Sequence, residues 1–532
     1  MTSEKQQNFC QETEKPSSLY IRVLVVVLAF SALMRFRNLD TESFWLDELT
    51  TLSAISQGSW RSTMEGWLSM VGMGTWLMYY WKVLVGDSDF ALRSLSAICG
   101  VLLVLVVSEF TRKIHDEKAA IIASSMISIS HLAILYSQEF RPYMFTTLFI
   151  WSSFYLIRLD RKLRPFEILF CIILLSFSYL VHYLAGLAIV LGLLTDFTLR
   201  VVNHIKNEEK HQNGWKYSVF NFIKSKGGQT LQVSVSIAFL AYFMLDKMIY
   251  DSSNTGHSMW INDVPKRPVV SLFDYFFAFD TRGYFTDIAE FMWYFVLATP
   301  VILLIHRFMF KKKGVLEEAE WFVWLVGGGT MLIVVIYSLQ VRNLWVSRYF
   351  VFSMPAWYML FGLGISRIID IIQFKDIESN FNPKFDVSKI IAITFSAIFV
   401  LYSTTWLVED FNYYEKNGRS DFKGMSIWLD DNVDGNQDDV FIVSQPYSRY
   451  WDLYLDRMGS DVEIDVDSDW GDVTSGQVTS ILDDEPTEVI HIRGHRLSMW
   501  DYDSLTLVLK SNYELVESVD FIEGQIDVYH RI

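Results

Sequence analysis

The chain is poor in cysteine, with only Cys10, Cys99 and Cys171 among its 532 residues. Cys99 and Cys171 lie in or beside apolar segments, and the last quarter of the sequence contains no cysteine. This distribution excludes a disulfide framework and offers no spacing typical of metal ligands. Internal sequence repeats are also lacking.

Basic residues are scarce in the C-terminal segment. Between Glu409 and Ile532 there are 28 Asp and Glu but 9 Lys and Arg, so this segment has a net charge of −19. Because the net charge of the whole chain is −16, the rest of the chain carries about +3. The break in composition predicts a separate acidic domain over residues 409–532. Nucleic acid is excluded as a partner, because contact with phosphates needs a basic face.

Apolar residues are abundant. Hydrophobic residues make up 51% of the chain and aromatic residues 16%, and the mean hydropathy is +0.23. Soluble proteins of this size are seldom so apolar, and several windows approach the ~20 residues that cross a bilayer. The windows are Leu19–Met34, Ala91–Phe110, Phe166–Val181, Leu231–Met248, Trp321–Val326 with Met331–Leu339, and Ile390–Trp406. No small-residue cleavage site follows the first window, which indicates a retained helix rather than a signal peptide.

The charge of the connecting loops predicts the orientation. Lys and Arg gather at alternate connections, as is typical of loops that stay in the cytoplasm. These clusters lie at 112–118, 158–164, 206–226 and 311–313. We therefore expect a polytopic α-helical membrane protein with about eleven transmembrane helices. Residues 1–18 would form a cytoplasmic tail, residues 19–408 the transmembrane domain, and residues 409–532 an extracytoplasmic domain.

The alternation of basic loops requires that Gly66–Val85 does not cross the membrane. We interpret this segment as re-entrant or interfacial, within a first outer loop at 36–90. The other expected outer connections are Ser137–Pro142, His182, Tyr250–Glu290 and Gln340–Ser347.

The acidic domain has the pattern of a mixed α/β fold, with short β-rich runs between polar residues. The expected strands are Asp439–Ser444, Glu488–Ile492 and Phe521–Tyr529, and the expected helices are Tyr447–Leu455 and Ser504–Lys510. Asn432–Gly435 and Gly459–Gly471 are expected to be acidic, turn-rich loops.

Polar side chains gather at the outer connections of this topology. They are Asp47 and Glu48 in the first loop, Gln138, Glu139, Arg141 and Tyr143 after the third span, His182 after the fifth, and Arg348 at the tenth. Ionisable groups so close to hydrocarbon are costly, so they usually serve function or pair with one another. Each has an ordinary alternative: a solvated loop for the adjacent acids, an interfacial ion pair, an aromatic belt or a snorkelling anchor. Their convergence on one face is the stronger signal.

This set of side chains suits the transfer of a sugar from a phosphate leaving group. A carboxylate can take the proton of an acceptor hydroxyl as that hydroxyl attacks the anomeric carbon. Arginine binds a departing phosphate with two-pronged geometry. Trp and Tyr rings offer apolar faces for a sugar or an isoprenoid chain.

At these residues the sequence resembles the membrane glycosyltransferases of the GT-C fold, in particular the dolichyl-phosphate-mannose-protein mannosyltransferase and aminoarabinose transferase group (glycosyltransferase family 39-like). The resemblance is carried, in order, by FWLDELTT at 44–51, GDSDFALRSLSAICG at 86–100, YSQEFRPYMF at 136–145, HYLAG at 182–186 and SRYFVFSMPAWYML at 347–360. FNYYEKNGRSDFKGMSIWL at 411–429 and DDVFIVSQPYSRYWDLYL at 438–455 resemble the outer domain of prokaryotic members.

The resemblance implies an inverting transferase with a polyprenyl-phosphate sugar donor, either dolichyl or undecaprenyl. It implies that Asp47 is the base and that Glu48, Glu139 and Gln138 are the other acidic or acceptor-orienting positions. It also implies a donor phosphate and lipid site at Arg348, with Arg141, Tyr143, His182, Tyr79 and Tyr80 around the donor. A divalent metal, if one is used, would meet Asp47 and Glu139.

One departure from the family concerns the first loop. Many relatives have His-Pro-Pro before a Leu-Tyr-Tyr sequence, whereas here the stretch from Val71 to Tyr80 keeps the tyrosine pair but has neither the histidine nor the prolines. The metal, the sugar and the acceptor (protein, lipid or glycan) therefore stay open.

Two other classes of function compete with the enzyme. A transporter is disfavoured because the ionisable residues gather at one face and not at the midplane between related halves. The other alternative is a non-catalytic scaffold that displays the acidic domain outside the cell. Replacement of Asp47 distinguishes the two, because a scaffold would tolerate it and an enzyme would lose turnover.

Overall fold

The computed structural model describes residues 15–56, 72–159, 161–208, 221–239, 286–310, 318–340, 345–374, 387–405, 407–408, 420–433, 439–445, 448–467, 485–494 and 504–532. The chain divides into two compact units. Unit 1 consists of Met1–Arg35, Ile98–Tyr136 and Tyr143–Trp406, and unit 2 of Phe36–Ala97, Ser137–Pro142 and Leu407–Ile532.

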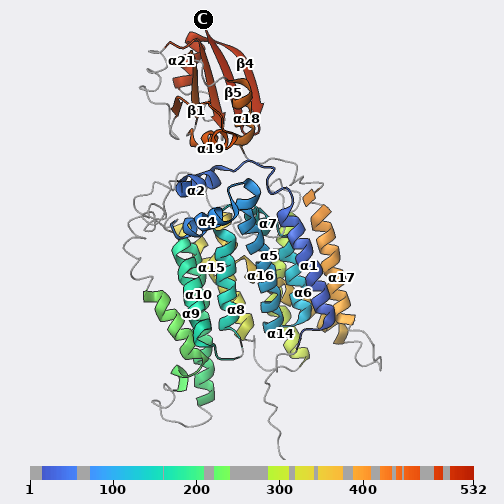
Figure 1. The fold of residues 1–532 in the computed structure, drawn as a ribbon. Helices are drawn as coiled ribbons and strands as arrows, with labels where there is room; N and C mark the ends of the chain where they lie inside the picture. Colours follow the sequence, from blue (N-terminus) through green and yellow to red (C-terminus); the bar gives the residue numbers. More distant parts are fainter. Residues whose placement is uncertain are drawn as a thin grey trace, which may run out of the picture. The chain divides into compact units, whose positions relative to one another are not determined.

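Unit 1 is a bundle of helices that run side by side (Figure 1). Its described helices are α1 (Ser18–Phe36), most of α5 (Asp89–Ile114), α6 (Glu117–Ile129), α7 (His131–Ser137), α8 (Tyr143–Ile157), α9 (Pro165–Val181), α10 (Tyr183–Glu208), α14 (Thr286–Met309), α15 (Glu318–Gln340), the 3₁₀ helix η2 (Ser347–Phe352), α16 (Met354–Phe374) and α17 (Val387–Thr405).

The apolar helices confirm the prediction of a multi-pass helical membrane protein. Among the described residues, six helices are long and apolar enough to cross a membrane, or up to seven if the bent pair α6 and α7 forms one span. The predicted total of about eleven spans also relies on residues outside the described ranges, among them the second half of Leu231–Met248.

The tenth predicted span opens differently from the expectation. We expected a membrane helix to begin at Arg348, but that residue lies in η2, and α16 begins at Met354. Pro355 explains the break, because proline fits the first turn of a helix but cannot continue one from upstream.

Helix α6 is the most deeply buried of the elements that the structure describes in unit 1. Its N-cap Asp116 accepts the Ala119 backbone N–H at 2.8 Å, and every side chain from Ala119 to Ile129 is buried. The helix packs on α16 and α17. A Cβ atom on Gly362 of α16 would lie 2.5 Å from the Ala119 carbonyl oxygen, so only glycine permits this close approach.

Ion pairs within unit 1 join the helix ends that carry the basic clusters predicted to face the cytoplasm. Lys118 pairs with Asp370, which also lies 3.3 Å from the His306 ring. Arg158, at the end of α8, binds Asp196 of α10 at 2.8 Å. Such pairing offsets the cost of charge near hydrocarbon and fixes the helix ends against one another.

Unit 2 combines two short helices of the first loop, the start of α5, residues 137–142 and the C-terminal segment. Its described elements besides α5 are α2 (Leu46–Ser56), α4 (Gly72–Val85), α18 (Phe422–Asn432), β1 (Val440–Gln445), α19 (Arg449–Met458), β2 (Val466–Asp467), β3 (Glu488–Gly494), α21 (Ser504–Asn512), β4 (Tyr513–Phe521) and β5 (Gly524–Arg531). With its 14 residues, α4 rises about 21 Å, less than the ~30 Å of a hydrocarbon core.

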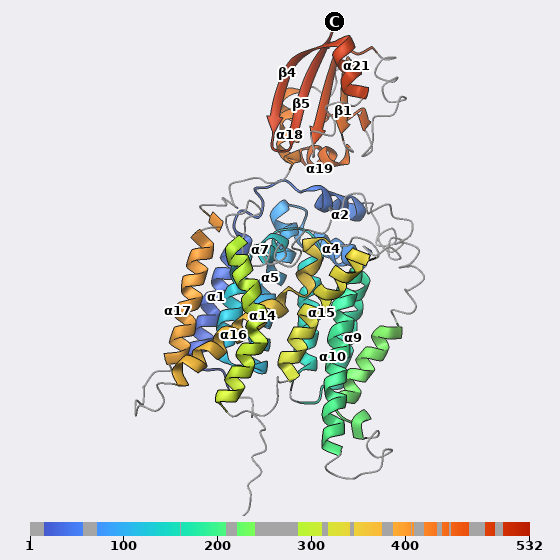
Figure 2. The same cartoon turned by 180° about the vertical axis from the view of Figure 1, so that it is seen from behind.

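The sheet of unit 2 has five strands in the order β2-β1-β3-β5-β4 (Figure 2). Strand β1 is parallel to β2 and β3, whereas β5 is antiparallel to β3 and β4. Helix α21 supplies Leu509 to the core on one face, together with Val443 and Val489. On the other face, α18 approaches so closely that a Cβ on Gly494 would lie 2.7 Å from the Phe422 ring.

The mixed α/β prediction for the acidic segment is confirmed, with one strand misplaced. The expected strands at 439–444 and 488–492 correspond to β1 and β3, and the expected helices to α19 and α21. The third expected strand, Phe521–Tyr529, corresponds to β5 but was placed to begin too early, because a turn at Ile522 and Glu523 separates β4 from β5. Glu523 has φ of 45°, a left-handed conformation that suits a tight hairpin turn. Helix α18 was not expected, and β2 lies inside the expected loop Gly459–Gly471.

Candidate functional site

Helix α2 carries the two adjacent carboxylates in its first turn. Glu48 closes the start of the helix, because its Oε2 accepts the Trp45 backbone N–H at 3.2 Å while its own N–H donates to the Trp45 carbonyl at 2.8 Å. Asp47 and Glu48 are both favoured there by the positive end of the helix dipole. The local sequence thus explains why a helix begins at Leu46.

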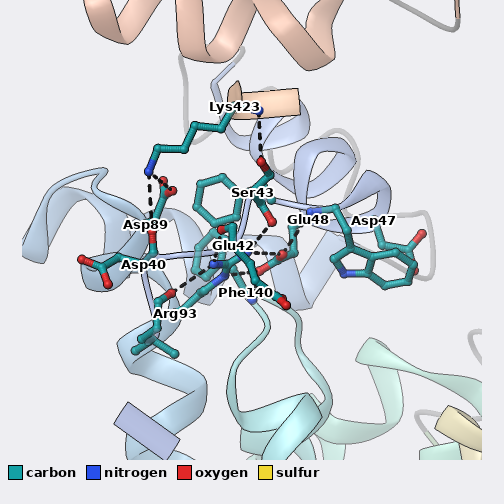
Figure 3. A network of polar contacts seen from close by, with 12 residues as sticks. Asp40, Glu42, Ser43, Asp47, Glu48, Asp89, Arg93, Phe140 and Lys423 are labelled. Carbon is teal, nitrogen blue, oxygen red and sulfur yellow. Dashed lines mark hydrogen bonds and ion pairs between the residues drawn. The ribbon is translucent and has the colours of Figure 1, made fainter. Parts of the chain in front are cut away.

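Glu48 forms a fully buried ion pair with Arg93 of α5 (Figure 3). Arg93 Nε donates to Glu48 Oε1 at 3.0 Å, and the second guanidinium nitrogen donates to Oε2 at 2.8 Å. The guanidinium also lies 4.6 Å from the centre of the Phe44 ring. This two-pronged geometry compensates the cost of removing both charges from water.

The remaining donors of Arg93 organise the chain that leads into α2. They bind the carbonyl oxygens of Leu39 at 3.0 Å, Glu42 at 2.8 Å and Ser43 at 2.9 Å. One side chain therefore fixes both the helix and the loop before it. Sequence reasoning missed Arg93 as a site residue, although it lies within the segment at 86–100 that carries part of the family resemblance.

The segment after α7 is attached to the same carboxylate. The Phe140 backbone N–H donates to Glu48 Oε1 at 2.6 Å, and Gln138 Nε2 donates to the Arg37 carbonyl at 2.9 Å. Glu139 is buried, and its carbonyl accepts the Arg141 N–H at 2.8 Å. The first loop and the segment Ser137–Pro142, which the sequence predicted on one face, thus meet at Glu48.

Asp47 has a more open environment than its neighbour. Its side chain is 26% exposed, and Oδ2 lies 3.8 Å from a guanidinium nitrogen of Arg141. Another nitrogen of Arg141 donates to the Asp47 carbonyl at 2.9 Å and to Thr51 Oγ1 at 2.7 Å. Arg141 therefore orients the turn that carries Asp47 while the carboxylate keeps contact with solvent.

Two predicted aromatic residues lie on α4, which packs against α2. Tyr79 and Tyr80 meet edge to face, with ring centres 5.4 Å apart, and Trp76 adds a third ring 4.9 Å from Tyr80. Tyr80 is exposed. This group offers apolar ring faces within unit 2, as the sequence analysis expected of a lipid or sugar contact.

The other predicted residues come together in unit 1. The His182 ring lies 6.2 Å from Tyr143 and 4.9 Å from Tyr349. Tyr349 in turn lies 5.8 Å from the guanidinium carbon of Arg348. The starts of α8 and α10 and the helix η2 therefore meet in one aromatic cluster around His182, with Arg348 at its edge.

Helix α19 also contacts the first loop within unit 2, a feature that sequence reasoning did not find. The Phe44 N–H donates to the Tyr454 hydroxyl at 2.6 Å, and Arg457 binds Asp89 at 2.6 Å. Burial raises the pKa of the Tyr454 hydroxyl, and the negative charge of Asp89 adds to the shift. Tyr454 is therefore a neutral hydrogen-bonding group at physiological pH.

The described carboxylates do not form a metal site. In the part of the chain that the structure describes, no group of three or more His, Cys, Asp or Glu side chains could hold an ion. Glu48 is committed to Arg93 and the Phe140 amide. The resemblance leaves Asp47 and Glu139 as the candidate metal ligands. Two side chains are fewer ligands than a protein metal site usually provides.

Comparison with known families identifies a match over part of the chain. Residues 72–219 match the model of the dolichyl-phosphate-mannose-protein mannosyltransferase family. The match includes α4, Glu139, Arg141 and His182 but begins after Asp47. No curated protein matches the sequence.

Solved structures are similar over nearly the whole length. Two are crystal structures of ArnT from Cupriavidus metallidurans, in the apo state and bound to undecaprenyl phosphate. The TM-scores are 0.50 and 0.51 at 10% and 11% identity, and each match covers 96% of this chain and 97% of ArnT. The chain has the GT-C fold. The apo oligosaccharyltransferase of Archaeoglobus fulgidus is also similar, with a TM-score of 0.48 at 13% identity over 88% of this chain and 69% of that one.

The GT-C fold confirms the architecture expected from the sequence. A helical membrane domain is joined to a C-terminal domain with a small sheet, as in the fold class that the ordered motifs indicated. At this low identity the similarity concerns the fold, so the chemistry must be argued from the residues themselves.

Proposed function

We propose that this chain is a membrane glycosyltransferase that moves a hexose or pentose from a polyprenyl-phosphate donor to an acceptor. The GT-C fold and the family match over residues 72–219 support this class of reaction. ArnT has been crystallised with undecaprenyl phosphate, which supports a carrier lipid of the same kind here. The acceptor is a glycan, a lipid or a protein of the cell envelope.

The observation that carries the proposal is the environment of Asp47. In the transfer, the acceptor oxygen attacks the anomeric carbon, the bond from that carbon to the phosphate oxygen breaks, and polyprenyl phosphate leaves. Asp47 takes the proton of the attacking hydroxyl, and the anomeric configuration inverts. Its solvent contact allows an acceptor to approach, and Arg141 fixes the turn that carries it.

The other predicted residues have supporting roles in this proposal. Glu48 is a positioning residue rather than a second base, because its carboxylate is buried against Arg93. Arg348 binds the donor phosphate, and Tyr143 and His182 flank it. Tyr79 and Tyr80 contact the lipid or the sugar.

Gln138 and Glu139 complete the acceptor side of the proposed site. They belong to the segment whose Phe140 N–H is bound by Glu48. Their effect on transfer would therefore be exerted through the position of this segment and, for Glu139, through its charge.

Transfer is measured in vitro with purified protein and a polyprenyl-phosphate sugar. Asp47→Asn keeps the size of the side chain but removes its basicity, so turnover should fall about a hundredfold or more while donor binding changes little. Arg348→Ala should weaken donor binding, because the phosphate loses its charged partner. Near wild-type transfer by Asp47→Asn would refute Asp47 as the base. If the protein consumes no donor and also tolerates this substitution, the proposal that it is an enzyme is refuted.

The outer location of the site is part of the proposal and has its own test. Cys99 and Cys171 are buried. Once Cys10 is replaced, labelling of an introduced cysteine therefore reports the side of the membrane on which that cysteine lies. A cysteine at Glu514 should react with an impermeant thiol reagent in intact cells, whereas one at Lys162, within a basic cluster, should react only after lysis. The reverse pattern would contradict the orientation.

A further inference from the structure

The chain enters helix α2 through residues that two separate parts of unit 2 bind. Arg93 of α5 holds the carbonyl oxygens of Glu42 and Ser43. The C-terminal segment makes the other contacts, because the Ser43 hydroxyl is bound by α18 and the Phe44 backbone N–H by α19. Asp47 comes only one turn later in the sequence, so these contacts define the point from which its helix starts.

The Ser43 side chain completes the N-terminus of α18 (Figure 3). It is buried, and its hydroxyl donates to Asp421 Oδ1 at 2.8 Å and accepts the Lys423 backbone N–H at 3.0 Å. Asp421 is the N-cap of the same helix and accepts the Gly424 N–H at 2.9 Å. The first backbone N–H groups of a helix have no acceptor within it. One of those of α18 is therefore satisfied by a residue 380 positions away.

Phe44 is enclosed by the C-terminal segment and by α5. Its ring has no solvent exposure and stacks on the Tyr454 ring with centres 6.3 Å apart. The guanidinium carbons of Arg93 and Arg457 lie 4.6 and 5.3 Å from the centre of the Phe44 ring. The buried Tyr454 hydroxyl accepts the Phe44 N–H at 2.6 Å. Displacement of Phe44 would leave a buried N–H without this acceptor, which is costly.

These contacts are separate from those that hold the joined elements together. The sheet packs with α21 through its own apolar cluster, and α2 is fastened by the ion pair of Glu48 and Arg93. Neither Ser43 nor Tyr454 belongs to that cluster or to that pair. Removal of either hydroxyl should therefore loosen the path into α2 while the sheet and the helix remain folded.

The path into α2 determines where the Asp47 carboxylate lies, because Asp47 is in the first turn of the helix. Arg93 binds only backbone carbonyls of this path, whereas α18 and α19 bind the Ser43 side chain and the Phe44 N–H. A displacement of about 1 Å at a reacting group can lower a rate about a hundredfold. The contacts from the C-terminal segment are therefore of the kind that can control turnover.

We propose that the C-terminal segment positions the proposed base, because α18 and α19 fix the path into α2 through Ser43 and Phe44. Ser43 and Tyr454 are positioning residues that act through Asp47. The inference rests on the proposed function for the role of Asp47 as the base. It gives the acidic domain a part in the transfer step.

The first experiment measures kcat and KM of the purified full chain in lipid nanodiscs, with a polyprenyl-phosphate sugar that the wild type consumes. Tyr454→Phe keeps the ring but removes the acceptor of the Phe44 N–H, so kcat should fall about tenfold. Ser43→Ala should lower kcat at least about threefold. KM for the donor should stay within about twofold of wild type in both variants, because the contact that is lost is not one with the donor.

The matched control is Ser518→Ala on β4. The Ser518 hydroxyl donates to Asp527 Oδ1 at 2.6 Å and accepts a hydrogen bond from Gln525 Nε2 at 2.7 Å. The substitution therefore removes the same kind of group as Ser43→Ala from an element that has no hydrogen bond to the first loop among the described residues, and kcat should stay at the wild-type value.

A conservative pair tests the hydrogen bond at the N-terminus of α18. Asp421→Ala removes the acceptor of the Ser43 hydroxyl and the cap of the helix, so it should lower kcat at least as much as Ser43→Ala. Asp421→Asn keeps a side-chain oxygen and is an equally good N-cap. It should restore most of the kcat that Asp421→Ala loses.

The second experiment measures the position of the loop without any substrate, by amide hydrogen exchange of the full chain with mass spectrometry. Exchange in residues 43–50 should be about tenfold faster in Tyr454→Phe and faster in Ser43→Ala, because local opening becomes easier there. In Ser518→Ala this segment should exchange as in the wild type. Exchange in β1 and β3 should be unchanged in all three variants, which separates a local displacement from a general loss of stability.

The outcomes separate this inference from the proposed function. If the wild type transfers sugar and both Tyr454→Phe and Ser43→Ala keep its kcat, the positioning role is overturned and the transferase stands. A fall in kcat that Ser518→Ala shares, or faster exchange throughout β1 and β3, would assign the effect to stability and also overturn it. If the wild type consumes no polyprenyl-phosphate sugar, the transferase proposal fails and this inference fails with it.

Discussion

Asp47 and Glu48 are consecutive carboxylates on one helix, yet their surroundings are opposite. The Glu48 side chain has no solvent exposure and binds Arg93 through both oxygens. The Asp47 side chain is 26% exposed, and its Oδ2 lies 3.8 Å from a guanidinium nitrogen of Arg141. Because successive residues of a helix point about 100° apart, one turn directs Glu48 into the interior and Asp47 toward solvent.

The two environments suit different work. A buried carboxylate with every oxygen engaged has little freedom to accept a further proton, but it can hold several segments in register. A partly exposed carboxylate on a fixed turn can meet a substrate without rearranging the protein. A rigid, buried carboxylate beside an open one on the same helix turn is therefore an arrangement expected at a reactive site.

The largest effect should come from breaking the buried pair. Arg93→Met leaves the Glu48 charge buried and removes the partner of three backbone carbonyls, which should lower the free energy of unfolding by about 3–5 kcal/mol. Thermal unfolding of the detergent-solubilised chain measures this loss. The double variant Arg93→Met with Glu48→Gln removes the unpaired charge and should unfold at a higher temperature than Arg93→Met alone. Equal stability of the single variant and the wild type would contradict the structural role.

The next effect should separate stability from transfer at the adjacent carboxylate. Asp47→Asn should leave the unfolding free energy within about 0.5 kcal/mol of wild type while transfer falls about a hundredfold. Glu48→Gln should reduce both, because the pair with Arg93 is weakened. If Asp47→Asn unfolds at a lower temperature than Glu48→Gln, the roles assigned to the two carboxylates are reversed.

A third effect tests a buried group that is neutral rather than charged. His491 of β3 is fully buried and bonded to Gln445 Oε1 at 2.6 Å, and burial, with the nearby Arg493, lowers the pKa of its ring. The unfolded chain, with a His pKa near 6.5, binds the proton more readily. Stability should therefore be complete above about pH 6.5 and decrease as the pH falls below it, by about 1 kcal/mol near pH 5.5. Comparison of unfolding between pH 7 and 5.5 for wild type and His491→Gln should show a smaller decrease in the variant. Parallel pH profiles would assign the decrease to other groups.

The smallest effect concerns the ionic contacts of Asp89, a buried carboxylate whose basic partners reach toward solvent. Arg457 binds this carboxylate at 2.6 Å and Lys423 lies 3.5 Å away, and both basic side chains are partly exposed. Asp89→Asn should cost less than about 1 kcal/mol at low salt. At 1 M salt the difference from wild type should shrink. The wild type itself should gain stability with salt, because screening reduces the repulsion among its acidic residues. A difference that grows with salt would argue against an ionic contact.

The sequence predicted the carboxylates but not the partner that distinguishes them. Asp47 and Glu48 are equivalent by adjacency, charge and helix propensity, so local patterns could not say which one is buried. The distinction comes from Arg93, 45 residues later than Glu48. Such a pairing depends on how α5 packs, which no periodicity reveals.

Other expectations can be traced to features that the sequence displays directly. Tyr143, His182 and Arg348 were grouped because alternating basic loops assign their segments to one side, and the aromatic cluster of unit 1 brings these residues together. Strands β1 and β3 were recognisable from β-branched runs. The hairpin at Glu523 was missed because it uses a glutamate in a left-handed conformation, where asparagine or glycine would have signalled a turn.

The hydrogen bond from Phe44 to Tyr454 joins residues 410 positions apart. During synthesis the loop with Asp47 emerges among the first segments, and α19 emerges near the end. A chain cut short before α19 therefore carries the carboxylate without the helix that receives the Phe44 amide. The contact between the first loop and α19 can therefore form only near the end of translation, and a shortened chain lacks it.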